Sequence, residues 1–260
     1  MAAQDRKISL HFQRFEFKYQ LPLVMVEGLI PEFLKYLEID PYAVDLPDNY
    51  YHVNSLYYDS LGLGCYYEKL AGIEKRKKLR VRFYDDNFDG QTPIFLEIKG
   101  KHGAVVIKDR VKLNYSQAKN ILINNQLSIG ELPAGEAQTL NRFLWIKLRN
   151  GMIPKVMVKY KRKPFISKLN PDFRVTIDYD LKAYAADWIN EPQAGKEICP
   201  QMAVLELKFN NSLPDWFHRI IQRYNLEQKP FSKYCNSLEA ISPEFINDYP
   251  TFFNRELLVY

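Results

Sequence analysis

The stretch KRKKLRVRFY, residues 75–84, decides the fold. Successive side chains of a β-strand point to opposite faces, so residues of one parity share a face. One parity of this stretch holds Arg76, Lys78, Arg80 and Arg82. The other holds Lys77, Leu79, Val81 and Phe83. The pattern predicts a strand with one strongly basic face and one mainly apolar face.

The same alternation returns in four other segments, at 14–19, 94–101, 105–113 and 202–210. Their charged parities hold Arg14, Glu16 and Lys18; Glu97, Lys99 and Lys101; Lys108, Arg110 and Lys112; and Glu206 and Lys208. An ordinary sheet with one solvated face would mix neutral polar residues with both signs of charge. Like charges on neighbouring strands repel each other, so this composition indicates a bound anion.

The predicted fold class is α+β: a closed antiparallel β-barrel with helices packed outside. Strands flank a helical middle without βαβ alternation, which favours an antiparallel sheet. Helices are expected at 116–126, opened by Ser116, at 134–150, and after a capping box at Ser212. A hairpin is expected to pair 65–71 with 75–85. The chain is expected to be one domain over 1–260, with a core at about 12–240 and a C-terminal extension at 241–260.

In a closed barrel the charged faces would line the lumen, where each unpaired charge costs several kcal/mol. A bound polyanion would offset that cost. Arginine binds phosphate oxygens in a bidentate manner and lysine acts as a movable point charge, so the residue types suit a chain of phosphates. Single-stranded nucleic acid is disfavoured, because stacking aromatics should accompany the cations, whereas Phe15, Phe17 and Phe83 fall on the opposite parity.

Composition excludes several other classes. The net charge is only +5, and the three cysteines and four histidines form no metal-ligand spacing. No apolar run of about 18 residues occurs, so no transmembrane segment is expected. These features predict a cytoplasmic protein. They set neither an oligomeric state nor a membrane-protein partner.

Ten short motifs, in order along the chain, carry a family resemblance. They are RFEFKY (14–19), VNSLYYDS (53–60), YEKLAG (67–72), KLRVRFY (78–84), FLEIKGK (95–101), KDRV (108–111), KYKR (159–162), RVTIDYD (174–180), VLELKF (204–209) and FSKYCNSL (231–238). Together they resemble the VTC domain, the polyphosphate polymerase domain of the vacuolar transporter chaperone complex, which has the triphosphate tunnel metalloenzyme fold. The phosphate-sensing SPX domain and membrane helices of the eukaryotic complex are not in this sequence, so a free-standing, prokaryotic-type version is expected.

The resemblance implies a polyphosphate polymerase that transfers the γ-phosphate of ATP to a growing polyphosphate chain. The implied catalytic residues are Arg80, Arg82, Lys99, Arg162 and Glu206. The implied phosphate-binding residues are Lys18, Lys78, Lys108, Arg110, Tyr160, Arg174, Lys208, Ser232 and Lys233. Glu206 would bind a divalent metal, Mn²⁺ or Mg²⁺, and Glu16 and Glu97 are further candidate ligands.

Two alternatives stay open at this point. One is a triphosphatase or polyphosphatase of the same fold, and the other is a non-catalytic, regulatory polyphosphate-binding protein. The hydrolase branch of the fold has Glu-x-Glu-x-Lys on its first strand, whereas Arg14 occupies the first of these positions here. That difference removes one metal ligand and argues against a two-metal triphosphatase.

Overall fold

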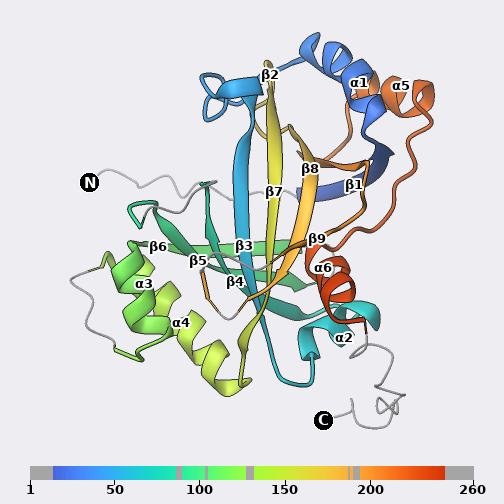
Figure 1. Cartoon of the computed structure of the whole chain (residues 1–260). Helices are drawn as coiled ribbons and strands as arrows, with labels where there is room; N and C mark the ends of the chain where they lie inside the picture. Colours follow the sequence, from blue (N-terminus) through green and yellow to red (C-terminus); the bar gives the residue numbers. More distant parts are fainter. Residues whose placement is uncertain are drawn as a thin grey trace, which may run out of the picture.

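The computed structural model describes residues 14–85, 90–102, 105–126, 132–186, 188–189 and 194–243. A ten-stranded antiparallel sheet dominates these residues (Figure 1). The strands are β1 (Arg14–Pro22), β2 (Leu37–Ile39), β3 (Tyr51–Asp59), β4 (Arg76–Phe83), β5 (Ile94–His102), β6 (Val105–Leu113), β7 (Ile153–Ser167), β8 (Arg174–Ala185), β9 (Lys196–Glu197) and β10 (Met202–Asn210). The helices are α1 (Val24–Leu34), the 3-10 turn η1 (Pro47–Asn49), α2 (Gly64–Leu70), α3 (Tyr115–Leu122), α4 (Ala134–Arg149), α5 (Asp215–Arg223) and α6 (Lys233–Ile241).

The sheet is open, and the prediction of a closed barrel is wrong. Its strand order is β1-β10-β8-β7-β3-β4-β5-β6, so β1 and β6 are its two edges. The chain between α5 and α6 runs along the free edge of β1, where Gln228 forms a bridge with Tyr19. The backbone N–H of Lys229 also donates to the carbonyl of Lys18 at 3.0 Å. This segment takes up edge positions of β1 that barrel closure would need, and it protects the edge as coverage by a loop commonly does.

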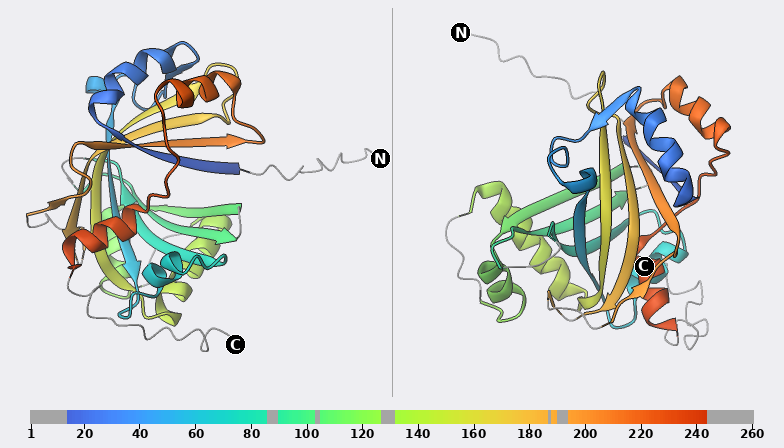
Figure 2. Two further views of the ribbon diagram at one scale, coloured as in Figure 1. Left: turned by 90° about the vertical axis from the view of Figure 1, so that its right-hand side faces the viewer. Right: turned by 45° about the horizontal axis from the view of Figure 1, so that its top comes forward.

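The open sheet is strongly curved. In the left view of Figure 2, β1 and β10 lie in one arm and β4, β5 and β6 lie in the other, with β3 and β7 at the bend. The helices α1 and α5 cover the outer side of the first arm, and α3 and α4 cover that of the second. The expectation that helices pack outside the sheet is therefore confirmed, although the sheet does not close.

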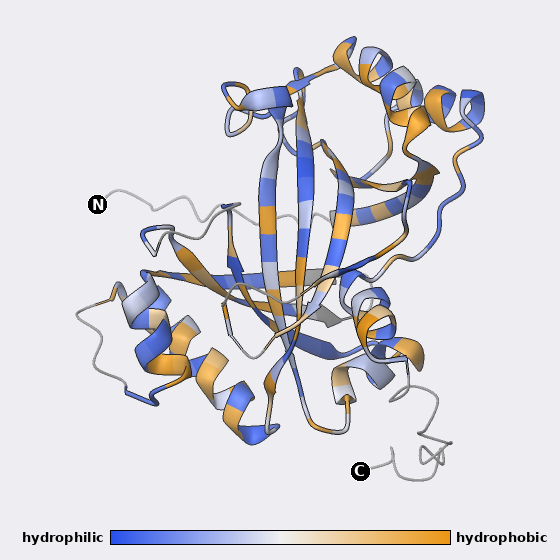
Figure 3. Ribbon diagram, viewed as in Figure 1, coloured by the Kyte–Doolittle hydropathy of each residue, from blue (hydrophilic) through white to orange (hydrophobic). Residues whose placement is uncertain are grey.

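The predicted alternation of side chains is confirmed in the packing. On β4, Leu79 and Val81 are fully buried, and they belong to a core cluster with Phe143 of α4. A second apolar cluster joins β1, β8 and β10 to α1 and α5 around Phe33. Figure 3 shows the resulting change between hydrophilic and hydrophobic residues along the strands. With the apolar residues turned toward the helices, the charged residues are left on the inner, concave face.

Several local predictions need correction. Residues 65–71 were expected to form a strand, but 64–70 is the helix α2, because the buried carboxylate of Asp59 accepts hydrogen bonds from its first-turn N–H groups, those of Cys65 and Tyr66. Asn114, not Ser116, caps α3. The helix α5 begins after Pro214 without a side-chain cap, so the capping box at Ser212 is wrong. Most of the expected C-terminal extension lies outside the described residues.

Candidate functional site

Charged side chains from both arms of the sheet meet on its concave side. Lys99 of β5 and Glu16 of β1 are not on neighbouring strands, yet their charged atoms lie 3.3 Å apart. We call this surface the charged face. It consists of Glu16, Lys18, Lys78, Arg80, Arg82, Glu97, Lys99, Lys108, Arg162, Asp178, Glu206, Lys208 and Lys233. Cations outnumber carboxylates in this set, so the face attracts anions.

Glu97 organises the arm formed by β4, β5 and β6. Its carboxylate is fully buried and lies 2.6 Å from Arg80 Nε and 2.6 Å from Lys108 Nζ, with Arg82 Nε at 4.0 Å. Burial alone would raise the pKa of Glu97, but these three cations lower it to about 2. The carboxylate therefore stays ionised and fixes the positions of the arginines.

Glu16 and Glu206 organise the arm formed by β1 and β10. Lys18 Nζ lies 3.0 Å from Glu16 and 4.0 Å from Glu206, and Lys208 Nζ lies 2.6 Å from Glu206. Burial and the neighbouring Glu206 raise the pKa of Glu16, but Lys18, Lys99 and Lys208 together lower it to about 2. Lysines on both sides likewise hold the pKa of Glu206 well below its usual range, against its burial.

Asp178 of β8 joins the sheet to α6. The Arg162 guanidinium donates to both of its oxygens, at 2.6 and 2.8 Å, and Lys233 Nζ lies 2.5 Å from it. Asp178 is fully buried, and its pKa is lowered by the two cations despite that burial. The ring of Tyr160 lies beneath Lys233 Nζ, 4.8 Å from its centroid. Asp178 thereby places one cation from a strand and one from a helix on the same face.

Neutral groups hold the remaining cations. Arg82 donates from Nε to the Ser55 hydroxyl at 3.0 Å and from Nη2 to the Tyr160 hydroxyl at 3.4 Å. Lys78 Nζ lies over the ring of Tyr234, 4.7 Å from its centroid. No carboxylate among the described residues lies within ion-pair distance of Lys78. These cations keep much of their charge available to an added anion.

Lys99 and Lys108 have pKa values below that of an ordinary lysine. Burial lowers the pKa of each to about 8, although Glu16 and Glu97 respectively oppose the change. Their side chains remain 36% and 38% exposed, so they lie where the face meets solvent. An anion bound beside them would restore their full charge at neutral pH.

Three predicted site residues are not part of this ion-pair network. Arg110 lies opposite Glu97 in the β5–β6 register, but its exposed side chain stacks on Phe95, 5.1 Å from the ring centroid. Arg174 is exposed and donates from Nε to the carbonyl of Pro171 at 3.3 Å. Ser232 caps α6 by accepting a hydrogen bond from the Cys235 N–H. The structure brings the other predicted residues together on the charged face or, for Tyr160, directly beside it.

Sequence reasoning did not place Asp178, Ser55 or Tyr57 among the site residues. Asp178 alternates with apolar residues in RVTIDYD (174–180), but alternation gives only its face of the strand and not its partner, and Ser55 and Tyr57 belong to no charged run. Asp178 lies directly opposite Arg162 in the β7–β8 register, a pairing that requires knowledge of which strands are neighbours. The helix α6, which supplies Lys233, was also not predicted.

A metal ion would have few protein ligands here. Within the described parts of the chain, no three His, Cys, Asp or Glu side chains come together in a metal-binding group. Both oxygens of Glu97 are held by cations at 2.6 Å, which makes it the weaker candidate. One oxygen of Glu206 has only contacts at 4.0 Å, and Glu206 is close enough to Glu16 to act on the pKa of that carboxyl. Magnesium in phosphate-transfer sites commonly uses one or two carboxylates plus substrate oxygens, and Glu206 with Glu16 fits that arrangement.

Comparison with protein families decides the affiliation of the chain. The model of the VTC domain matches residues 13–242, which include every strand and helix that contributes to the charged face. The chain belongs to the VTC domain family. The resemblance to the VTC domain is thereby confirmed, and membership of this family points to a function related to polyphosphate.

Other comparisons add little to this affiliation. A solved structure titled "Structure of PH1819 protein from Pyrococcus Horikoshii OT3" is 13% identical to this VTC domain, with a TM-score of 0.45, and the match covers 87% of this chain and 98% of that one. A comparison with curated proteins gives no match. No helix in the described ranges has the length and apolar character needed to cross a membrane.

Proposed function

We propose that this VTC domain is a polyphosphate polymerase that transfers the γ-phosphate of ATP to the end of an inorganic polyphosphate chain. The observation that carries the proposal is the excess of buried and half-buried cations on the charged face. Arg82, Arg162 and Lys233 are each less than 10% exposed, yet Arg162 and Lys233 share the single carboxylate of Asp178, and Arg82 lies 4.0 Å from Glu97. Buried cations with incomplete counter-charge are costly. A chain of phosphates supplies repeated negative charge at a spacing that cations from several strands can share.

Phosphoryl transfer depends mainly on in-line placement and on neutralising charge at the transferred group. Glu97 holds Arg80 and Arg82 on β4, and Asp178 holds Arg162 over the ring of Tyr160, whose hydroxyl accepts a hydrogen bond from Arg82. These guanidinium groups would bind the equatorial oxygens of the transferred phosphoryl group. Lys18, Lys99 and Lys208 would hold the rest of the chain beside Glu16 and Glu206.

A divalent cation, Mn²⁺ or Mg²⁺, would bind to Glu206 and Glu16 together with phosphate oxygens. It would supply further charge neutralisation at the reacting phosphates. The residues of this chain would orient the anions around it. Lys18 and Lys208 keep both carboxylates ionised, which is the form that a hard cation requires.

Binding can be tested with adjacent lysines on opposite faces of β4. Lys78 lies on the charged face and Lys77 is exposed on the other side. Polyphosphate at 100 times its dissociation constant should stabilise the protein by about 2.7 kcal/mol, or about 5–10 °C in Tm. Lys78→Met should reduce this stabilisation, and Lys77→Met should leave it unchanged. Equal effects of the two variants would place the anion elsewhere.

Activity is tested by incubating the purified protein with ATP and Mn²⁺, with and without a short polyphosphate primer. Gel-resolved phosphate polymer that depends on Arg80 would support the polymerase. Release of inorganic phosphate without polymer would instead identify a hydrolase. Tight polyphosphate binding with neither product would identify a binding protein.

A further inference from the structure

Tyr57 lies within the charged face, although it belongs to none of the charged alternating runs. It is on β3, directly opposite Arg80 in the β3–β4 register, and its side chain is only 7% exposed. Its hydroxyl oxygen accepts a hydrogen bond from Arg80 Nη1 at 3.4 Å. A buried phenol oxygen therefore lies where the two arginines of β4 are held.

The charged groups that act most strongly on Tyr57 are cations. Arg80 and Arg82 approach from β4, Lys233 from α6 and Lys18 from β1. Burial alone would raise the pKa of Tyr57, but Arg80, Arg82 and Lys233 together lower it to about 8. The nearest carboxylate of the Arg80 cluster, Glu97, is itself engaged by Arg80 and Lys108 at 2.6 Å.

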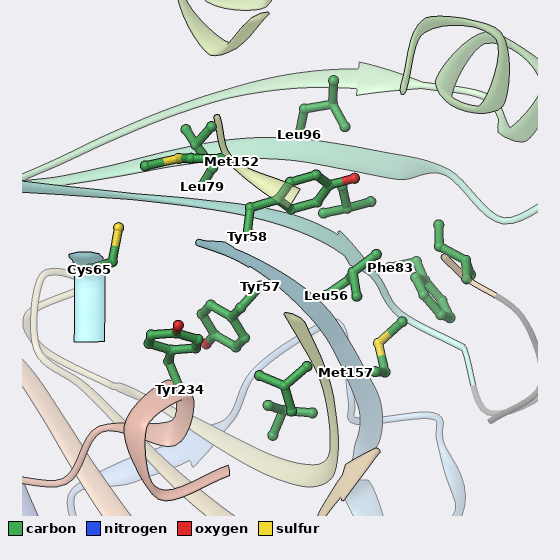
Figure 4. Close-up of a cluster of buried hydrophobic side chains, with 14 of the residues drawn as sticks. Leu56, Tyr57, Tyr58, Cys65, Leu79, Phe83, Leu96, Met152, Met157 and Tyr234 are labelled. Atoms are coloured by element: carbon green, nitrogen blue, oxygen red, sulfur yellow. The ribbon is translucent and has the colours of Figure 1, made fainter. Parts of the chain in front are cut away.

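The neighbouring Tyr234 of α6 is in a different situation. Its ring lies beside that of Tyr57, with centroids 5.5 Å apart and planes at 38° (Figure 4). Its hydroxyl donates to the buried Asp59 carboxylate, and burial together with that carboxylate raises its pKa. Tyr234 is thus held as a neutral donor, and Tyr57 is the phenol directed to the cations.

We propose that in mildly alkaline solution the Tyr57 hydroxyl is an internal counter-charge of the anion site, ionised against Arg80 and Arg82 without ligand and protonated when phosphate binds there. The inference rests on the proposed function, because it assigns a role at the same site. On binding, the phenolate oxygen takes one proton from solvent and forms its O–H bond, and no bond of the ligand breaks. The neutral phenol then donates a hydrogen bond to a phosphate oxygen. Arg80 and Arg82 form ion pairs with the bound anion in place of the phenolate.

Two consequences follow from this exchange. Binding above about pH 8 takes up a proton at Tyr57. Affinity then falls by about tenfold per pH unit between the free and ligand-bound pKa values of this group. Lys99 and Lys108, each with a pKa of about 8, also take up protons when an anion binds. The contribution of Tyr57 is therefore isolated only by comparison with Tyr57→Phe.

The test is a pH titration of tyrosinate, followed by near-ultraviolet difference absorbance, with and without tripolyphosphate. Ligand-free wild-type protein should show a single-tyrosine step near pH 8, and tripolyphosphate should move it upward. Tyr57→Phe should lack the step. Tyr42→Phe, which removes a phenol that is 87% exposed and distant from the charged face, should retain it.

Calorimetry in buffers of different ionisation enthalpy provides the second measurement. At a pH above the step, each tripolyphosphate bound to the wild type should be accompanied by the uptake of as much as about one more proton than in Tyr57→Phe. A wild-type titration without the step, or a step that bound tripolyphosphate does not move, would overturn the inference even if the variant fails to fold. Absence of tripolyphosphate binding altogether would instead overturn the proposed function.

Discussion

Replacing Asp178 with asparagine should destabilise the ligand-free protein strongly while increasing its stabilisation by bound anions. Asp178 is fully buried, and its carboxylate is the partner of both Arg162 and Lys233. Removing one partner of a buried ion pair costs about 3–5 kcal/mol, because the remaining charge has no counter-charge. At about 2–4 °C per kcal/mol for a domain of this size, Tm should fall by about 6–20 °C.

The bound anion should recover part of that loss. Arg162 and Lys233 would be short of negative charge in Asp178→Asn, so polyphosphate should raise the Tm of the variant by more than it raises that of the wild type. Thermal unfolding followed by circular dichroism, with and without tripolyphosphate, measures both effects. Asparagine keeps the size of the side chain, so the comparison isolates the charge.

Asp180 provides the matched control two residues further along β8. It is 39% exposed and pairs with Lys161 at 3.4 Å and Lys182 at 3.3 Å. An exposed pair contributes about 0–1 kcal/mol, so Asp180→Asn should shift Tm by no more than a few degrees. Equal shifts for the two variants would refute the argument from burial. If tripolyphosphate raised the Tm of Asp178→Asn and of the wild type by the same amount, the idea that Arg162 and Lys233 also bind the anion would be refuted.

Other predictions concern acid stability, the core and the placement of α6. The lowered folded-state pKa of Glu97, about 2, contributes about 3 kcal/mol of stability that is present above pH 4.5 and is lost as pH falls toward 2. Glu97→Gln should abolish this contribution, which urea unfolding across the same pH range measures. Phe143→Ala should cost about 3–5 kcal/mol in urea unfolding because the ring is fully buried, whereas Leu148→Ala, at a position 72% exposed, should cost less than about 0.5. Asp59→Asn should weaken the attachment of α6 and speed hydrogen exchange there, with β5 unaffected, because the Asp59 carboxylate accepts a hydrogen bond from the Tyr234 hydroxyl.

Alternation along single strands was predictable because it depends only on backbone geometry. The parity of residues 76–83 placed Arg80 and Arg82 on one face and Leu79 and Val81 on the other, as observed. The bulk of the charged face followed from repeating that reasoning on other strands. Pairing between strands was less accessible, so sequence reasoning could not assign Asp178 to the site, because its role depends on lying opposite Arg162 in the β7–β8 register.

The error at residues 65–71 has a physical source. The segment CYYEKLA is rich in aromatic residues, which favour strands in general. Its helical state is set by tertiary contacts, because Asp59, at the end of β3, satisfies the N–H groups of Cys65 and Tyr66. A hydrogen bond from another element outweighed the local preference, and no spacing within the segment signals it.

The difference between a closed and an open sheet changes how the site is held together. In a barrel, backbone hydrogen bonds between the edge strands would fix the distance between the two arms. Here Gln228 and Lys229 lie against the edge of β1, which approaches β6 without a described backbone pairing, and the ion pair of Glu16 with Lys99 connects β1 to β5. A half-exposed ion pair is a weak constraint. An anion bound between the arms would contact cations of both and would add the cross-link that the backbone lacks. Anion binding should therefore stabilise the relative position of the two arms, and a fixed position of the arms should in turn favour anion binding.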